Sequence, residues 1–133
     1  MSISLTAAVR RELLRHPGVT EGTHRFGGIE FRLGRHELGH LHGEYIADLP
    51  FPRRVRDELV ADGRALAHHV LPSSGWVSRH VESPDDVAVI VELFRMSYER
   101  AAAAQARRRA GDVAQEDAAA GARSDDDPQE AAA

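Results

Sequence analysis

The chain has 133 residues, with 17 arginines, no lysine, no cysteine and a formal net charge of −4, a length that supports one domain with a modest core. Without cysteine there is no thiolate nucleophile, disulfide or cysteine-based zinc site, and without lysine there is no Schiff-base chemistry or lysine-dependent phosphate loop. The acidic balance argues against a nucleic-acid partner, and no apolar segment is long enough to span a bilayer, so we expect a soluble cytoplasmic protein.

The N-terminal segment has the pattern of an amphipathic helix. Leu5, Val9 and Leu13 recur every four residues. This spacing places them on one face and predicts a helix over residues 4–15, which Pro17-Gly18 would stop.

Two extended segments follow this helix. Apolar side chains suitable for burial predict a strand over residues 24–33, and Gly34-Arg35 is typical of a hairpin turn. A second extended stretch covers residues 37–49, with a bend at Gly43. The two segments together predict two or three antiparallel strands.

The next region predicts a short helix and two short strands. Pro52 suits a first helical position, and Gly63 suits the position just past a helix end. Residues 67–71 and 76–81 have strand composition, and the Pro- and Gly-containing segment 72–75 separates them.

The last helix carries the clearest signals. Ser83 can cap it, Pro84 suits its first turn, and Asp85 and Asp86 complement the positive end of a helix. Apolar residues over 87–98 form a broad face that requires a sheet to cover it. The element order predicts an α+β two-layer sandwich: a mainly antiparallel sheet with helices on one face, including a long C-terminal helix.

Composition divides the chain near residue 100. We expect a folded domain over residues 1–100 and an Ala-rich segment over residues 101–133 that lacks the apolar residues needed for a core. Alanine and arginine favour helix, so Ala101–Ala110 can extend the preceding helix. We expect the remainder to be a disordered acidic tail.

One short segment carries a pattern that is typical of a metal-binding site. Residues 36–40 spell His-Glu-Leu-Gly-His, a pattern that on a helix holds zinc between two imidazoles and places a glutamate beside the metal-bound water. His36 and His40 would then be zinc ligands, with Glu58 as a third. However, glycines at positions 34, 39 and 43 leave room for only about two helical turns.

The same segment can be interpreted as a strand, on which residues two apart share a face. Strict alternation would place four side chains on one face: His36, Leu38, His40 and His42. His40 and His42 could then chelate a metal ion together with a ligand from another strand, or they could simply fill a polar sheet face.

A set of motifs resembles a known family. The set comprises Glu37-x-x-His40-x-His42, Gly63, His69, Gly75-Trp76 and Ser97-Tyr98. Over roughly residues 25–100 this order resembles the luciferase domain, whose fungal members oxidise a hydroxylated pyrone-polyphenol with molecular oxygen, without flavin or metal. The resemblance implies functional roles for His40, His42, His69 and Trp76.

We therefore expect a small-molecule-binding domain for an aromatic or planar ligand, with His40, His42 and His69 as catalytic residues of a cofactor-independent oxidation. A neutral histidine can take a phenolic proton, Trp76 can stack on the ligand, and Asp48 can orient an imidazole. Two alternatives stay open: a zinc metallohydrolase, and a non-catalytic interaction module whose tail recruits a partner. The sequence leaves the oligomeric state and the presence of catalysis undecided.

Overall fold

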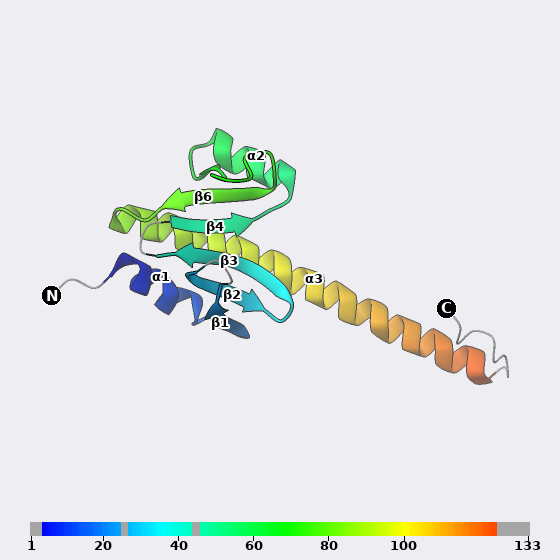
Figure 1. Cartoon of the computed structure of the whole chain (residues 1–133). Coiled ribbons are helices and arrows are strands. Elements are labelled where there is room, and N and C mark those ends of the chain that lie inside the picture. Colours follow the sequence, from blue (N-terminus) through cyan, green and yellow to red (C-terminus); the bar gives the residue numbers. More distant parts are fainter. Residues whose placement is uncertain (1–3, 25–26, 44–45, 125–133) are drawn as a thin grey trace. The chain divides into compact units, whose positions relative to one another are not determined.

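An antiparallel sheet of six strands organises the residues that the computed structural model describes, which are 4–24, 27–43 and 46–124, the last four without their side chains (Figure 1). The spatial order is β1-β2-β3-β4-β6-β5, and every neighbouring pair is antiparallel. The strands are β1 (Val19–Thr23), β2 (Ile29–Leu33), β3 (His36–His42), β4 (Ile46–Pro50), β5 (Leu66–Ala67) and β6 (Trp76–His80).

Three helices complete the α+β fold that the sequence predicts. They are α1 (Leu5–Leu13), α2 (Arg53–Ala61) and α3 (Pro84–Ser124). The Ser4 hydroxyl accepts a hydrogen bond from the Ala7 amide at the start of α1, as expected for an N-cap. No helix in the described part of the chain has the length and apolarity needed to cross a membrane.

The strands differ from the prediction at two places. Of the expected strand 24–33, residues 29–33 form β2, residues 24, 27 and 28 are not in a strand, and residues 25–26 lie outside the described residues. The strand β1 was not predicted, because its sequence, Val-Thr-Glu-Gly-Thr, has no buried side chain at the sheet edge. The expected strand 67–71 is limited to Leu66–Ala67. Its remainder turns away because the backbone N–H groups of Val70 and Leu71 donate to His68 Nδ1.

The face of the sheet opposite the histidines packs against the first part of α3. Phe31 and Phe94 meet edge to face with ring centroids 5.6 Å apart, a geometry worth about 0.5–1.5 kcal/mol beyond the area it buries. Leu49, Val77 and Leu93 are completely buried in the same core. Figure 1 shows this part of α3 running behind the strands.

The chain separates into two units within α3, one of residues 1–101 and one of residues 102–133. In the second unit the helix continues to Ser124, farther than the expected extension Ala101–Ala110. Residues 111–124, which we expected to be disordered, are therefore helical, in keeping with their alanine content. Residues 125–133 of the expected tail lie outside the described residues.

A β-bulge at Leu38 changes which side chains of β3 share a face. Phe31 pairs with Gly39, whereas the next residue of β2, Arg32, pairs with Glu37, so Leu38 is the extra residue. The Leu38 carbonyl accepts a hydrogen bond of 2.8 Å from the Ser97 hydroxyl of α3. The strict alternation expected from the sequence is therefore wrong on the N-terminal side of this bulge.

The bulge has two consequences for the histidine segment. Glu37 lies on the same face as His40, because their partners Arg32 and Glu30 are two residues apart on β2. His36 pairs with Leu33 and lies on the opposite face. The bulge thus brings a carboxylate to the histidine face and removes one histidine from it.

Candidate functional site

A row of polar side chains crosses three adjacent strands on one face of the sheet. The antiparallel register pairs His40 of β3 with Asp48 of β4, and Asp48 with Ser78 of β6. Residues paired across strands have neighbouring side chains, so this row is fixed by backbone hydrogen bonding. Asp48 occupies its centre and is completely buried.

The carboxylate of Asp48 is the point on which the surrounding side chains converge. Its Oδ1 accepts a hydrogen bond of 2.5 Å from the Ser78 hydroxyl. Its Oδ2 lies close to the Nε2 atoms of four histidines: His40 at 3.2 Å, His42 at 3.4 Å, His69 at 3.4 Å and His68 at 3.5 Å. Ser78 therefore fixes the carboxylate orientation that presents Oδ2 to the imidazoles.

His40 lies between two carboxylates. Its Nδ1 donates to Glu37 Oε2 at 2.8 Å, and its Nε2 lies 3.2 Å from Asp48 Oδ2. Burial by itself lowers the pKa of His40, but the hydrogen bonds to Asp48 and Glu37 raise it to about 9. Burial likewise raises the pKa of Asp48, whereas hydrogen bonds from His40 and Ser78 hold it well below its usual range.

The other shifts in the cluster follow from the same charges. The hydrogen bond from His40 lowers the pKa of Glu37. Burial, assisted by the nearby charge of His40, lowers the pKa of His42, and burial lowers that of His68. At neutral pH the cluster therefore combines a charged His40 with neutral rings at His42 and His68.

His68 is held in one tautomer by the backbone. Its Nδ1 accepts hydrogen bonds from the amides of Val70 at 3.1 Å and Leu71 at 2.9 Å. A nitrogen that accepts these bonds carries no proton, so the proton of the neutral ring lies on Nε2. His68 Nε2 therefore faces Asp48 as a hydrogen donor.

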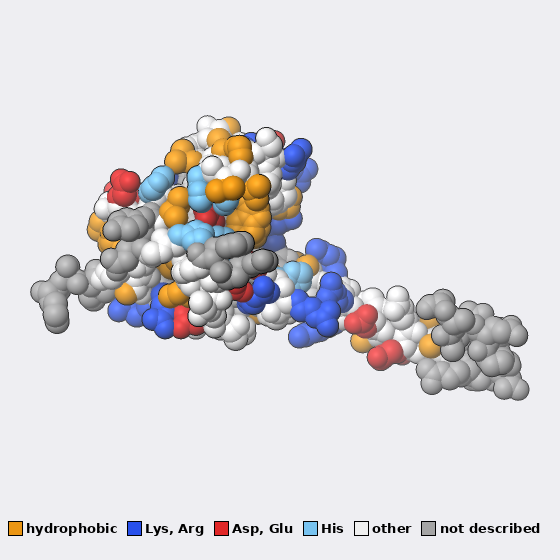
Figure 2. All heavy atoms as spheres, in the orientation of Figure 1, with side chains coloured by type: hydrophobic (Ala, Val, Ile, Leu, Met, Phe, Trp, Pro, Cys, Tyr) orange, Lys and Arg blue, Asp and Glu red, His pale blue; other side chains and the backbone are white. Residues whose placement is uncertain are grey.

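A cavity of about 410 Å³ opens above this cluster. Figure 2 shows histidine side chains gathered with hydrophobic ones on this face of the molecule. Eight residues line the cavity, which we call the histidine cavity: His24, His40, His42, His68, His69, Val70, Leu71 and Trp76.

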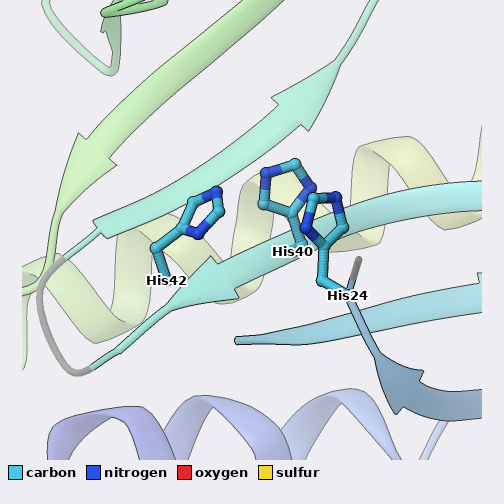
Figure 3. A group of neighbouring side chains, drawn as sticks. All are labelled: His24, His40 and His42. Carbon is cyan, nitrogen blue, oxygen red and sulfur yellow. The ribbon is translucent and has the colours of Figure 1, made fainter. Parts of the chain in front are cut away.

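The rings of the histidine cavity pack closely against one another. Figure 3 shows His24, from the segment after β1, beside the rings of His40 and His42. The His24 ring stacks on His40 with centroids 4.1 Å apart, and His42 meets His40 edge-on at 4.5 Å. The Trp76 ring lies 5.2 Å from that of His40. His40 is thus enclosed by aromatic rings.

The residues expected from the sequence lie together. His40, His42, His69 and Trp76 line the cavity, and Asp48 lies next to them in the sheet. Sequence reasoning missed the parts played by four others: His24, Glu37, His68 and Ser78. Two signals were available in the sequence: His68 is adjacent to His69, and Ser78 is two residues after Trp76 and so shares its strand face. The contribution of Glu37 depends on the bulge at Leu38.

The zinc alternative built on His36, His40 and Glu58 is wrong in its geometry. Residues 36–42 form a strand, not the helix that this motif requires. His36 points to the opposite face from His40, and Glu58 is exposed on α2. The His-Glu-x-x-His spelling therefore does not describe a shared site.

A family model matches the central part of the chain. Residues 35–97 match the family model of the luciferase domain, which confirms the resemblance over that range. The match includes the row from His40 to Ser78, together with His69 and Trp76. No curated protein and no solved structure matches the chain.

Proposed function

With residues 35–97 as a luciferase domain, we propose that the protein binds a small planar aromatic ligand bearing an ionisable hydroxyl group. The observation that carries this proposal is the histidine cavity, which is lined by five imidazoles, an indole and two aliphatic side chains. Its volume of about 410 Å³ falls within the range of small-molecule sites.

The residues that line the cavity match both the aromatic ring and the hydroxyl group of such a ligand. Trp76, Val70 and Leu71 offer apolar surface to an aromatic ring, and stacking on an indole favours a planar one. The histidines offer nitrogen atoms to a hydroxyl group. A non-aromatic or strongly cationic ligand would leave these features unused.

His69 is the residue best placed to receive the hydroxyl proton. It lies at the cavity rim with its side chain about half exposed, and its Nε2 donates to Asp48 Oδ2 at 3.4 Å. This hydrogen bond leaves the lone pair on Nδ1, which is the tautomer of a general base oriented by a carboxylate. His40 and His42 form the polar floor on which the ligand oxygen would lie.

The reaction we propose for this site is oxidation of the bound phenolate by molecular oxygen: a ring carbon forms a bond to O2 and loses two electrons, O2 is reduced to a peroxide, and the proton taken up by His69 is transferred to the peroxide oxygen. Loss of the hydroxyl proton makes an aromatic ring a stronger electron donor. Binding of the ligand and its oxidation are separate claims, so they need separate measurements.

The only tryptophan of the chain provides the binding assay. We expect planar hydroxylated aromatics, such as hydroxycoumarins and hydroxypyrones, to quench the fluorescence of Trp76 saturably, and their methyl ethers to bind at least about tenfold more weakly because no proton can be transferred. His69→Ala should weaken quenching, whereas His80→Ala, outside the cavity, should not. Absence of saturable quenching across the panel would contradict the proposal.

Oxygen uptake tests the catalytic claim. Uptake that depends on both protein and ligand, and that falls in His69→Ala, is the expected result. Saturable binding with no uptake would make the protein a binding module and would remove the oxidation step.

A further inference from the structure

We infer that His40, His42 and Asp48 form a two-histidine, one-carboxylate site for a divalent first-row transition-metal ion, at the floor of the histidine cavity. This inference goes beyond the proposed function, because the ion needs no aromatic ligand in order to bind. The three residues come from adjacent strands, β3 and β4, whose register holds them together.

The two distances from the Asp48 carboxylate suit a shared ion. Asp48 Oδ2 lies 3.2 Å from His40 Nε2 and 3.4 Å from His42 Nε2. Ligand atoms bonded to one ion at about 2.1 Å lie about 3.0 to 3.4 Å apart in octahedral or tetrahedral sites. Ligand atoms of His24, His40 and His42 lie within 4.8 Å of one another, as do those of Asp48, His68 and His69, so the proposed set joins two imidazoles of the first group to the carboxylate of the second.

The ring nitrogen of His40 that would not bind the ion is hydrogen-bonded, as is usual for histidines that ligate a metal. Its Nδ1 donates to Glu37 Oε2 at 2.8 Å, so Nε2 is the nitrogen left to bind an ion. The β-bulge at Leu38 places Glu37 on this face. A carboxylate behind the ring fixes its orientation and raises its basicity.

Asp48 is oriented in the same way. Ser78 donates a hydrogen bond of 2.5 Å to Oδ1, which leaves Oδ2 directed at the imidazoles. The hydrogen-bond partners of the two ligands, Glu37 and Ser78, are therefore both residues of the sheet. Ligands that such partners already hold in place lose little conformational freedom when the ion binds.

Two neighbouring histidines are poor ligands. The backbone bonds to His68 Nδ1 leave a proton on its Nε2, and a protonated nitrogen cannot bind a metal ion. The His24 ring stacks on His40 at an interplanar angle of 29°, and two stacked rings cannot both direct an in-plane lone pair at one ion. His42 is nearly perpendicular to His40, at 82°, and has no such restriction.

Two of the three ligands, His40 and His42, line the histidine cavity, so the remaining coordination positions of a bound ion would face it. Imidazole with a single carboxylate suits Fe²⁺ and Zn²⁺, and a two-histidine, one-carboxylate set with open positions is typical of non-haem Fe²⁺ sites. The open positions would be occupied by water or by the oxygen of a bound phenolate. The alternative occupant of the cluster is a proton on His40 between the two carboxylates.

Metal titration of the full chain tests this inference. The protein is stripped with a chelator, then titrated with Zn²⁺ in air and with Fe²⁺ without oxygen, and bound metal is measured by elemental analysis. We expect about one ion per chain and a melting temperature that rises with ion concentration. Failure of both ions to bind at this ratio would overturn the inference and would leave the proton on His40 as the occupant.

Matched variants on one strand locate the ion. We expect His42→Ala to weaken binding by at least about 100-fold, and Glu37→Gln by about tenfold, because it retains the hydrogen bond without the charge. His36→Ala lies on the same strand but on the opposite face and should bind as the wild type does. Equal losses in His36→Ala and His42→Ala, with both variants folded by circular dichroism, would contradict the assignment.

The result is separable from the ligand proposal. Fluorescence quenching of the metal-free protein by hydroxylated aromatics tests the cavity alone. If the protein binds the aromatic ligand but neither metal ion, only the metal site is contradicted. If it binds a metal ion but no aromatic ligand, only the proposed function is contradicted.

Discussion

His40 and Asp48 are cross-strand partners on β3 and β4, and their side chains meet with Nε2 3.2 Å from Oδ2. The pair is nearly inaccessible to solvent, since Asp48 is fully buried and His40 is 6% exposed. Burial of a carboxylate is unfavourable unless it is hydrogen-bonded or paired, so the imidazoles around Asp48 and the Ser78 hydroxyl are conditions of its burial. The cavity and the fold are therefore linked through this residue.

Replacing Asp48 should destabilise the whole domain. Asp48→Asn keeps the shape but removes the charge that His40 faces, and an amide nitrogen turned towards the imidazoles cannot accept their protons. We expect a loss of about 1–3 kcal/mol in the free energy of unfolding, measured by urea denaturation of the metal-free protein. Asp57→Asn, on the exposed side of α2, is the control and should change stability by less than about 0.5 kcal/mol.

Gly39 should tolerate no side chain. Its φ is +152°, and a Cβ there would lie 2.7 Å from the Asp48 carbonyl oxygen and 2.8 Å from Phe94 Cε1. Gly39→Ala should therefore cost about 1–3 kcal/mol or more. Gly22→Ala on β1, whose Cβ would meet no atom within 4 Å, should have little effect in the same denaturation assay. Similar stability of the two variants would contradict this description of the β3–α3 contact.

The start of α3 should be sensitive to acid. Burial raises the pKa of Asp86, but hydrogen bonds from the Glu82 amide and from Arg79 outweigh this and lower it. A lowered pKa means that the stabilisation is present above the pKa of the unfolded chain and is lost as the pH falls through the folded value. Asp86→Asn should cost about 1–2 kcal/mol at pH 7, and the difference from wild type should shrink below about pH 4.

The exposed neighbour Asp85 provides the control for that measurement. Asp85→Asn removes the same charge one residue earlier in the chain, without the hydrogen bonds that Asp86 receives. We expect a small effect on the free energy of unfolding at pH 7. If both variants showed the same pH profile, the acid sensitivity would come from the helix end in general.

His68 should hold the segment 68–71 in place. Its Nδ1 accepts the amides of Val70 and Leu71, so His68→Ala leaves both without this partner. We expect hydrogen exchange at these two amides to accelerate in His68→Ala and to stay unchanged in His69→Ala, measured by NMR. Equal exchange in the two variants would show that the turn does not depend on His68.

Trp76 should contribute to ligand binding through its ring. Trp76→Ala should weaken binding of a hydroxylated aromatic about tenfold, whereas Trp76→Phe, which keeps an aromatic face, should weaken it less. Calorimetry is the suitable readout because both variants lack the fluorophore. The order of the two variants is the test: an equal loss would contradict a contribution from an aromatic face at this position.

The local elements were predictable because each depends on nearby residues. The periodicity of Leu5, Val9 and Leu13 fixes the buried face of α1, and Ser83 and Pro84 mark the start of α3. The α+β class follows from the order of such elements. The proximity of His40, His42 and Asp48 could also be predicted once the segment was interpreted as a strand.

The tertiary structure decided the composition of the site. The bulge at Leu38 moved Glu37 onto the histidine face and His36 away from it, and a one-residue shift of this kind has no signature in the local pattern because either register satisfies backbone hydrogen bonding. His24, His68 and Ser78 reach Asp48 or its neighbours from other segments. Sequence patterns carry the period of each strand, but the pairing of distant strands depends on the packing of the whole domain, and that pairing is what brings four imidazoles to one carboxylate.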